Sequence, residues 1–263
     1  MPYLADVDFT WRSSDMAIVR WLLLAFQFTT IVPTPEIHNV SEQDIRKSVV
    51  WFPIIGGLLG GVLWLSDWFF SRYLSSMAAS AISLTLYTWL TGALHLDGLM
   101  DTADALGSRR SREIALEIMK DSRIGAMGAV AALLLLIGKF SALSSLSPPY
   151  LGYFVVVPMF SRLSMVWSMA FFPSARQEGL GWFFSRKLPF WVTLAATCMT
   201  LLLSVLLLPI QEVFWLWLVS VFVVLLFNGW MFKKFAGNTG DTYGALNEIV
   251  EWVGWMLLVF FNR

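Results

Sequence analysis

Eight apolar stretches, most of them close to 20 residues long, follow one another along this chain. They lie near residues 17–33, 49–71, 77–96, 125–146, 150–171, 188–208, 213–232 and 245–262. A helix needs about 20 mostly apolar residues to cross a bilayer. Inside the bilayer only a helix or a closed barrel pairs all of its backbone polar groups. The pattern therefore predicts an all-α polytopic integral membrane bundle. The expected number of transmembrane helices is seven to eight, because the first stretch is short and holds Arg20.

The composition agrees with a membrane protein and excludes several other classes. Apolar residues make up 57% and charged residues 14% of the 263 residues, against roughly 45–50% and roughly 25% in soluble domains. The 18 basic residues balance the 18 acidic ones, so no excess of positive charge indicates nucleic acid as a partner. No shift in composition marks a second unit, which predicts one integral membrane domain over residues 1–263. The sequence leaves open whether the chain forms a homo-oligomer.

The loops differ in their content of Lys and Arg. If each stretch crosses once, one side receives twelve of these residues and the other side three. The twelve are Arg46, Lys47, Arg109, Arg110, Arg112, Lys120, Arg123, Arg176, Arg186, Lys187, Lys233 and Lys234, and the three are Arg12, Arg72 and Arg263. The richer side is expected to be cytoplasmic, and it includes the segment that follows the third stretch. Between the third and fourth stretches, SREIALEIMKDSR predicts a short amphipathic helix at the cytoplasmic membrane surface.

Three carboxylates follow the third stretch, in the run HLDGLMDTADALG. Asp97, Asp101 and Asp104 are four and three residues apart, which places them on one stripe of a helix. A row of like charges favours a bound cation, and Mg²⁺ is commonly held by carboxylates together with substrate phosphates. His95 adds a candidate proton acceptor at the edge of the apolar stretch. The alternative is that water solvates these acids at the membrane surface.

Basic residues near this run are candidates for binding phosphate. The sequence IMKDSRIG brings Lys120, Asp121 and Arg123 together, and their alternative role is to anchor a cytoplasmic loop. Arg162 and Lys139 lie inside apolar stretches, so they are expected to face the bundle interior, toward carboxylates or a bound phosphate. The segment RQEGLGWFF, residues 176–184, is open to two interpretations, ligand contact or a plain loop.

A second polar turn, GNTGDTYGALNE, precedes the last stretch. Gly240 and Thr242 offer backbone N–H groups and a hydroxyl of the kind that bind phosphate. Asp241 and Glu248 are seven residues apart, so both could face one side of a helix and add metal ligands. An ordinary turn capped by Asp241 is the alternative.

These motifs together resemble the cobalamin synthase family, also called the adenosylcobinamide-GDP ribazoletransferases. The resemblance rests on runs in the family's order over nearly the whole chain: WFPIIGGLLG at 51–60, TGALHLDGLMDTADAL at 91–106, EIMKDSRIGAMG at 117–128, SR at 161–162, EGLG at 178–181 and GDTYGALNE at 240–248. Thr30 stands where the family usually has a basic residue, Ala93 where a glycine is more usual, and Tyr243 where the family often has an aliphatic residue.

The resemblance implies a multi-pass enzyme of the cytoplasmic (inner) membrane that catalyses the last joining step of cobalamin assembly. In that reaction α-ribazole, or its 5′-phosphate, attacks the pyrophosphate of adenosylcobinamide-GDP in the presence of Mg²⁺, and GMP leaves. Three rival functions remain: a membrane prenyltransferase, a CDP-alcohol phosphotransferase and an ion-coupled transporter. The first would need a second motif as rich in aspartate after a later span, and GDTYGALNE is sparse for that. The second would need a DxxDG element followed by Ala-Arg and two further spaced aspartates, which HLDGLMDTADAL does not supply.

Overall fold

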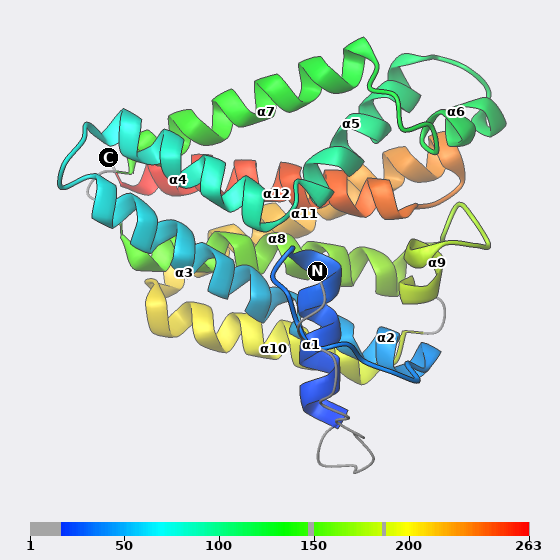
Figure 1. Ribbon diagram of the computed structural model, residues 1–263, viewed down its shortest axis with the longest axis horizontal. Helices are drawn as coiled ribbons and strands as arrows, with labels where there is room; N and C mark the ends of the chain where they lie inside the picture. The colour runs from blue at the N-terminus through cyan, green and yellow to red at the C-terminus, as the bar shows by residue number, and fades with distance from the viewer. Residues whose placement is uncertain (1–16, 147–149, 186–187, 263) are drawn as a thin grey trace, which may run out of the picture.

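The computed structural model describes residues 17–146, 150–185 and 188–262, and the regular elements in these ranges are helices (Figure 1). They are α1 (Ala17–Thr29), α2 (Glu42–Ser48), η2 (Val49–Trp51), α3 (Phe52–Phe70), α4 (Ser76–Leu90), α5 (Leu94–Gly107), α6 (Arg112–Ile118), α7 (Ala126–Ser145), α8 (Leu151–Phe171), α9 (Leu180–Ser185), α10 (Phe190–Leu207), α11 (Ile210–Phe235) and α12 (Gly240–Phe261). The predicted all-α membrane bundle is confirmed. Arg12, Arg186, Lys187 and Arg263, which enter the charge count, lie outside the described residues.

The described helices include six that are long and apolar enough to cross a membrane, or seven if α4 and α5 form one bent span. The first predicted stretch, 17–33, is not among these spans, because α1 has only 13 residues. Such a helix is about 20 Å long, whereas the apolar layer of a bilayer is about 30 Å thick. Figure 1 shows α1 running steeply across the other helices rather than along them.

Helix α8 is the centre of the bundle and packs against α3, α10, α11 and α12. Its contact with α3 depends on glycine. A Cβ atom at Gly56 or Gly60 would collide with the backbone oxygen of Pro158 or Phe154. Small residues at these positions therefore let the two helix backbones approach closely, as is common between membrane helices.

The third predicted span is not a continuous helix. Helix α4 ends at Leu90, and α5 begins at Leu94 in a direction that differs by 85°. Gly92 and Ala93 connect them with φ angles of +60° and +54°. This left-handed conformation ends a helix, and at Ala93 it costs about 1–2 kcal/mol because of the Cβ atom. The bend carries the aspartates of α5 away from the axis of α4.

The connections that carry predicted site residues gather at one end of the bundle. Figure 1 shows α2, α6, α9 and the turn between α11 and α12 at this end, opposite the C-terminus. The predicted short helix between the third and fourth stretches is present as α6. Ala115 of this helix is buried against the protein, while Ile114 is exposed.

Candidate active site

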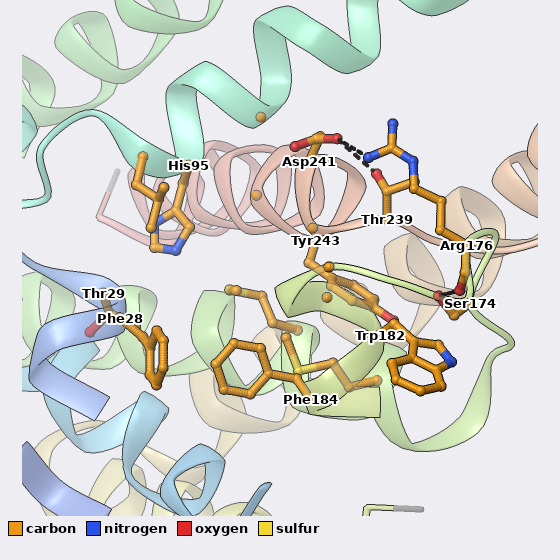
Figure 2. Close-up of a pocket in the computed structure, with 18 of the residues that line it drawn as sticks. Phe28, Thr29, His95, Ser174, Arg176, Trp182, Phe184, Thr239, Asp241 and Tyr243 are labelled. Carbon is orange, nitrogen blue, oxygen red and sulfur yellow. Dashed lines mark hydrogen bonds and ion pairs between the residues drawn. The ribbon is translucent and has the colours of Figure 1, made fainter. Parts of the chain in front are cut away.

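A cavity of about 290 Å³ lies at this end, between α1, α3, α5, α8, α9 and α12. One part of its wall is polar and includes Asp97, Arg176, Thr239 and Asp241. The remainder is mostly aromatic and apolar. Of the site residues predicted from sequence, His95, Asp97, Gly240 and Asp241 line the cavity. Figure 2 shows labelled residues from both parts of the wall.

Close packing of α5 on α12 builds the polar wall. A Cβ atom at Gly98 would lie 2.6 Å from the backbone oxygen of Asp241, and one at Gly244 would lie 3.1 Å from the backbone of His95. The two glycines therefore bring α5 and α12 nearly into backbone contact. Although they are far apart in sequence, His95 and Asp97 consequently share one wall with Asp241.

The first turn of α12 is held by a capping box. Thr239 accepts a hydrogen bond from the backbone N–H of Thr242 at 3.2 Å, and the Thr239 N–H donates to the Thr242 hydroxyl at 2.8 Å. The hydroxyl of Thr242 is thus engaged in the cap and is buried. Gly240, the first residue of the helix, lines the cavity instead. A helix N-terminus in this position favours anionic ligands such as phosphate.

The acidic residues of α5 form a crowded group beyond the bend that ends the apolar span of α4. Burial, followed by the charges of Asp97, Asp241 and Asp104, raises the pKa of Asp101 above its ordinary value. The carboxylate of Asp104 accepts hydrogen bonds from the backbone N–H groups of Gly125 and Gly128, at 2.7 and 2.8 Å, and so caps the start of α7. Within the described ranges, no three acidic, His or Cys side chains converge into a ready metal-binding group.

Arg176 is the basic residue in the polar wall, and sequence reasoning gave it no role beyond the charge count. One of its terminal nitrogens lies 3.7 Å from a carboxylate oxygen of Asp241, and the other donates to the backbone oxygen of Leu116 at 2.7 Å. Its segment, 176–184, was open to interpretation as a ligand contact. Glu178, Gly181 and Trp182 of that segment also line the cavity.

The cations predicted to bind phosphate lie elsewhere. Lys120 pairs with Glu117 at 3.0 Å and reaches Glu178, a residue of the cavity lining, at 3.5 Å. Arg123 pairs with Asp121 at 2.5 Å. This contact with Arg123 lowers the pKa of Asp121 to about 2. None of Lys120, Asp121 and Arg123 lines the cavity.

Glu248 and Arg162, which were predicted to lie in the site, are instead buried inside the bundle. Glu248 pairs with Lys139 at 2.6 Å instead of facing the same cavity as Asp241, and Lys139 also contacts Glu251 at 2.7 Å. Arg162 pairs with Glu251, so its charge is balanced by protein rather than by a bound phosphate. This buried ion cluster joins α7, α8 and α12. The expectation that Lys139 and Arg162 face interior carboxylates is confirmed.

His95 is only 3% exposed, and it lines the cavity. Among the described residues, neither of its ring nitrogens has a hydrogen-bond partner. Buried polar groups are nearly always paired, so these two nitrogens are available to a ligand.

Sequence comparison identifies the family. The chain matches the Cobalamin-5-phosphate synthase family over residues 21–259. The chain belongs to this family. A relative from Desulfitobacterium hafniense (strain Y51) is 36% identical over 90% of this chain and 95% of its own length. Another, from Thermosynechococcus vestitus, is 40% identical over 90% of this chain and 94% of its own length. Both are named adenosylcobinamide-GDP ribazoletransferase, and no solved structure matches the chain.

Membership in the cobalamin-5-phosphate synthase family confirms the resemblance inferred from the motifs. The protein is therefore an enzyme of cobalamin biosynthesis, a transferase by class. The six or seven apolar helices make it a multi-pass membrane protein. Among its motifs, GDTYGALNE forms the start of α12, and EGLG lies directly across from it, since a Cβ atom at Gly181 would lie 2.6 Å from the backbone nitrogen of Gly240.

Proposed function

We propose that this protein is a Mg²⁺-dependent transferase that joins α-ribazole, or its 5′-phosphate, to adenosylcobinamide-GDP and releases GMP. The observation that carries this proposal is the wall formed by Asp97, Asp241, Arg176 and the start of α12 in a chain of this family. The wall combines carboxylates with an arginine and a helix N-terminus. Such a combination suits a metal-bound pyrophosphate.

The acidic residues fit the proposed ion. Asp97 and Asp241 line the cavity and would supply hard oxygen ligands of the kind that Mg²⁺ prefers, whereas Asp101 and Asp104 lie outside the cavity lining. Burial, and after it the neighbouring carboxylates, raises the pKa of Asp101, and a cation would relieve the part that comes from negative charge. When bound, Mg²⁺ would neutralise charge on the pyrophosphate and on the departing GMP. Asp104 also caps α7, so its carboxylate has a structural role as well.

The protein's own groups would position the reacting atoms. Arg176 would bind phosphate oxygens with its planar guanidinium, and the first N–H groups of α12 would add further donors. A ribose hydroxyl of the acceptor then attacks the phosphorus next to the cobinamide, and the bond from this phosphorus to the GMP oxygen breaks. His95 or a carboxylate of the acidic group would accept the hydroxyl proton.

The distribution of charge supports a site that faces the cytoplasm. The cavity lies at the end of the bundle that carries α2, α6 and α9 (Figure 1). Arg46, Lys47, Arg112 and Lys120 belong to this end, whereas the short connection between α3 and α4 at the opposite end holds Arg72. Loops rich in Lys and Arg are retained on the cytoplasmic side.

An activity assay with purified, detergent-solubilised protein tests the proposed function. Incubated with adenosylcobinamide-GDP, α-ribazole 5′-phosphate and Mg²⁺, the protein should form GMP and a cobamide in equal amounts, measured by chromatography. Removal of Mg²⁺ with EDTA should stop the reaction, and addition of Mg²⁺ should restore it. Absence of both products under these conditions would refute the transferase proposal. Formation of both without a sealed vesicle excludes a transporter as the explanation.

Arg176 should contribute mainly to binding of the phosphate-bearing substrate. We expect Arg176→Ala to lower kcat/KM for adenosylcobinamide-GDP about 10- to 100-fold, because hydrogen bonds between charged groups are worth about 1.5–3 kcal/mol. Arg123→Ala is the matched control, since Arg123 is exposed and pairs with Asp121 outside the cavity. Steady-state kinetics of the two variants should differ clearly, and equal losses would remove the assigned role of Arg176.

A further inference from the structure

The apolar part of the cavity has an aromatic wall that the proposed phosphate chemistry does not use. Phe184 of α9 lies edge-on between two other rings, with centroids 4.9 Å from Phe28 of α1 and 5.6 Å from Phe52 of α3. All three line the cavity. The three segments are far apart in sequence, so their meeting here is a property of the tertiary structure. Clustered aromatic rings of this kind suit a flat, weakly polar ligand.

His95 is an unpaired polar side chain near this aromatic wall. Figure 2 shows His95 on the side of the cavity with Phe28 and Thr29, whereas Arg176 and Thr239 lie on the opposite side. The hydroxyl of Thr29 already donates to the backbone oxygen of Ala25 at 2.6 Å. Both ring nitrogens of His95 are without a partner in the described structure. A ligand at the aromatic wall would therefore meet the imidazole of His95, and the hydroxyl of Tyr243, which also lines the cavity, is likewise without a partner among the described residues.

The size of the cavity limits what it can hold. Pockets for small molecules measure about 300–1,000 Å³, and this cavity is at the lower limit, with about 290 Å³. A ring and its sugar fit within such a volume, whereas a whole corrinoid does not. If the proposed function holds, the candidates are the base of the acceptor nucleoside and the guanine of the GDP group.

The chemistry of the walls distinguishes these two bases. Guanine carries a ring N–H, an amino group, a carbonyl oxygen and a ring nitrogen acceptor along its edge, and most of these would be buried against phenylalanine without partners. Each unpaired polar group of this kind costs about 1–3 kcal/mol. The dimethylbenzimidazole of α-ribazole has two methyl groups and one unsubstituted ring nitrogen. This base therefore needs one hydrogen-bond donor, which an imidazole N–H of His95 can supply.

We propose that the aromatic wall formed by Phe28, Phe52 and Phe184 binds the base of α-ribazole, and that His95 donates a hydrogen bond to its unsubstituted ring nitrogen. This inference rests on the proposed function and assigns the acceptor base to one part of the site. The ribose then extends toward Asp97, Asp241 and Arg176, where the pyrophosphate is bound. With His95 engaged by the base, a carboxylate accepts the hydroxyl proton.

Removing one ring of the aromatic wall tests the location of the base. Phe184→Ala should raise KM for α-ribazole about tenfold or more and leave KM for adenosylcobinamide-GDP unchanged, because a base stacked on an aromatic ring gains about 1–3 kcal/mol. Phe183→Ala is the matched control, since Phe183 is adjacent on α9 but does not line the cavity. A raised KM for adenosylcobinamide-GDP alone, or no change in either KM, would overturn the inference while the transferase activity remained.

A second comparison tests the hydrogen bond from His95. The natural enzyme should prefer α-ribazole about tenfold over an otherwise identical nucleoside in which carbon replaces the unsubstituted ring nitrogen, since a buried donor would then lack its partner. His95→Ala should abolish this preference, and His95→Gln, which retains an N–H donor, should restore it with kcat close to the original. A preference that survives in His95→Ala, or a kcat lost in His95→Gln without a change in KM, would overturn the assignment. Complete absence of GMP release from the natural enzyme would instead contradict the proposed function.

Discussion

Replacing Asp97 with asparagine is expected to lower the turnover of ribazole transfer about 100- to 1,000-fold. Removing one group that stabilises charge at a reacting centre typically lowers kcat by a factor of this size. Asp97 lines the cavity and is among the charges that act on Asp101. The asparagine has nearly the same shape but lacks the negative charge, so it is a weaker ligand for Mg²⁺. The fold should be unaffected, because Asp97 is exposed.

The Asp97→Asn prediction is measured in two ways. Initial rates of GMP release at increasing Mg²⁺ should show a lower maximum and a need for more Mg²⁺. Separately, Mg²⁺ should raise the unfolding temperature of the natural protein, since a ligand that binds the folded state stabilises it. This increase should be smaller in the variant. Glu113→Gln is the control, because Glu113 is an exposed acid on α6 outside the cavity. An Asp97→Asn enzyme with unchanged rate and Mg²⁺ requirement would exclude a metal role.

Replacing Lys139 with methionine is expected to destabilise the bundle by about 3–5 kcal/mol. Removing one partner of a buried ion pair leaves an uncompensated charge, which has a cost of this size. Lys139 is 2% exposed and contacts both Glu248 and Glu251. In the variant Glu248 would lose its ion-pair partner, whereas Glu251 would retain Arg162. The loss should appear as a lower unfolding temperature in detergent and a lower yield of folded protein.

A double variant distinguishes the effect of an unpaired charge from the effect of lost packing in the buried ion cluster. Lys139→Met combined with Glu248→Gln removes one charge of each sign and keeps the pair of Arg162 with Glu251. Most of the lost stability should return, since no uncompensated charge remains. Lys233→Met, at an exposed position near the end of α11, is the control and should change stability little. If the double variant were as unstable as Lys139→Met alone, loss of packing rather than charge would explain the effect.

Most of the span locations could be predicted from sequence, because an apolar stretch of sufficient length has few alternatives to a helix in a membrane. The predicted stretch 150–171 corresponds to α8, and 188–208 to α10. The prediction failed where apolar length and helix length differ. Residues 17–33 are largely apolar, yet the helix ends at Thr29. The stretch 77–96 contains a break, because Gly92 and Ala93 adopt a left-handed backbone.

The chemistry of the site was only partly visible in sequence. The stripe of Asp97, Asp101 and Asp104 follows from helical spacing, and all three lie on α5. Arg176 belongs to a segment that the sequence left open as a ligand contact, but it had no role of its own, because its partner Asp241 is 65 positions later and a basic residue in a loop is explained equally well by membrane orientation. Arg162 and Glu248 were assigned to the site because spacing along one helix does not reveal partners on another.

By itself, the sequence therefore determined the membrane class, the approximate spans, the row of acids on α5 and the family of the protein. These depend on local properties: apolar length, helical periodicity and short motifs. Only the tertiary structure decided which charges face the cavity and which pair inside the bundle. It alone brought Phe28, Phe52 and Phe184 together and placed His95 and Asp241 on one wall. The physical reason is that these contacts join distant segments, and helix packing rather than local sequence brings such segments together.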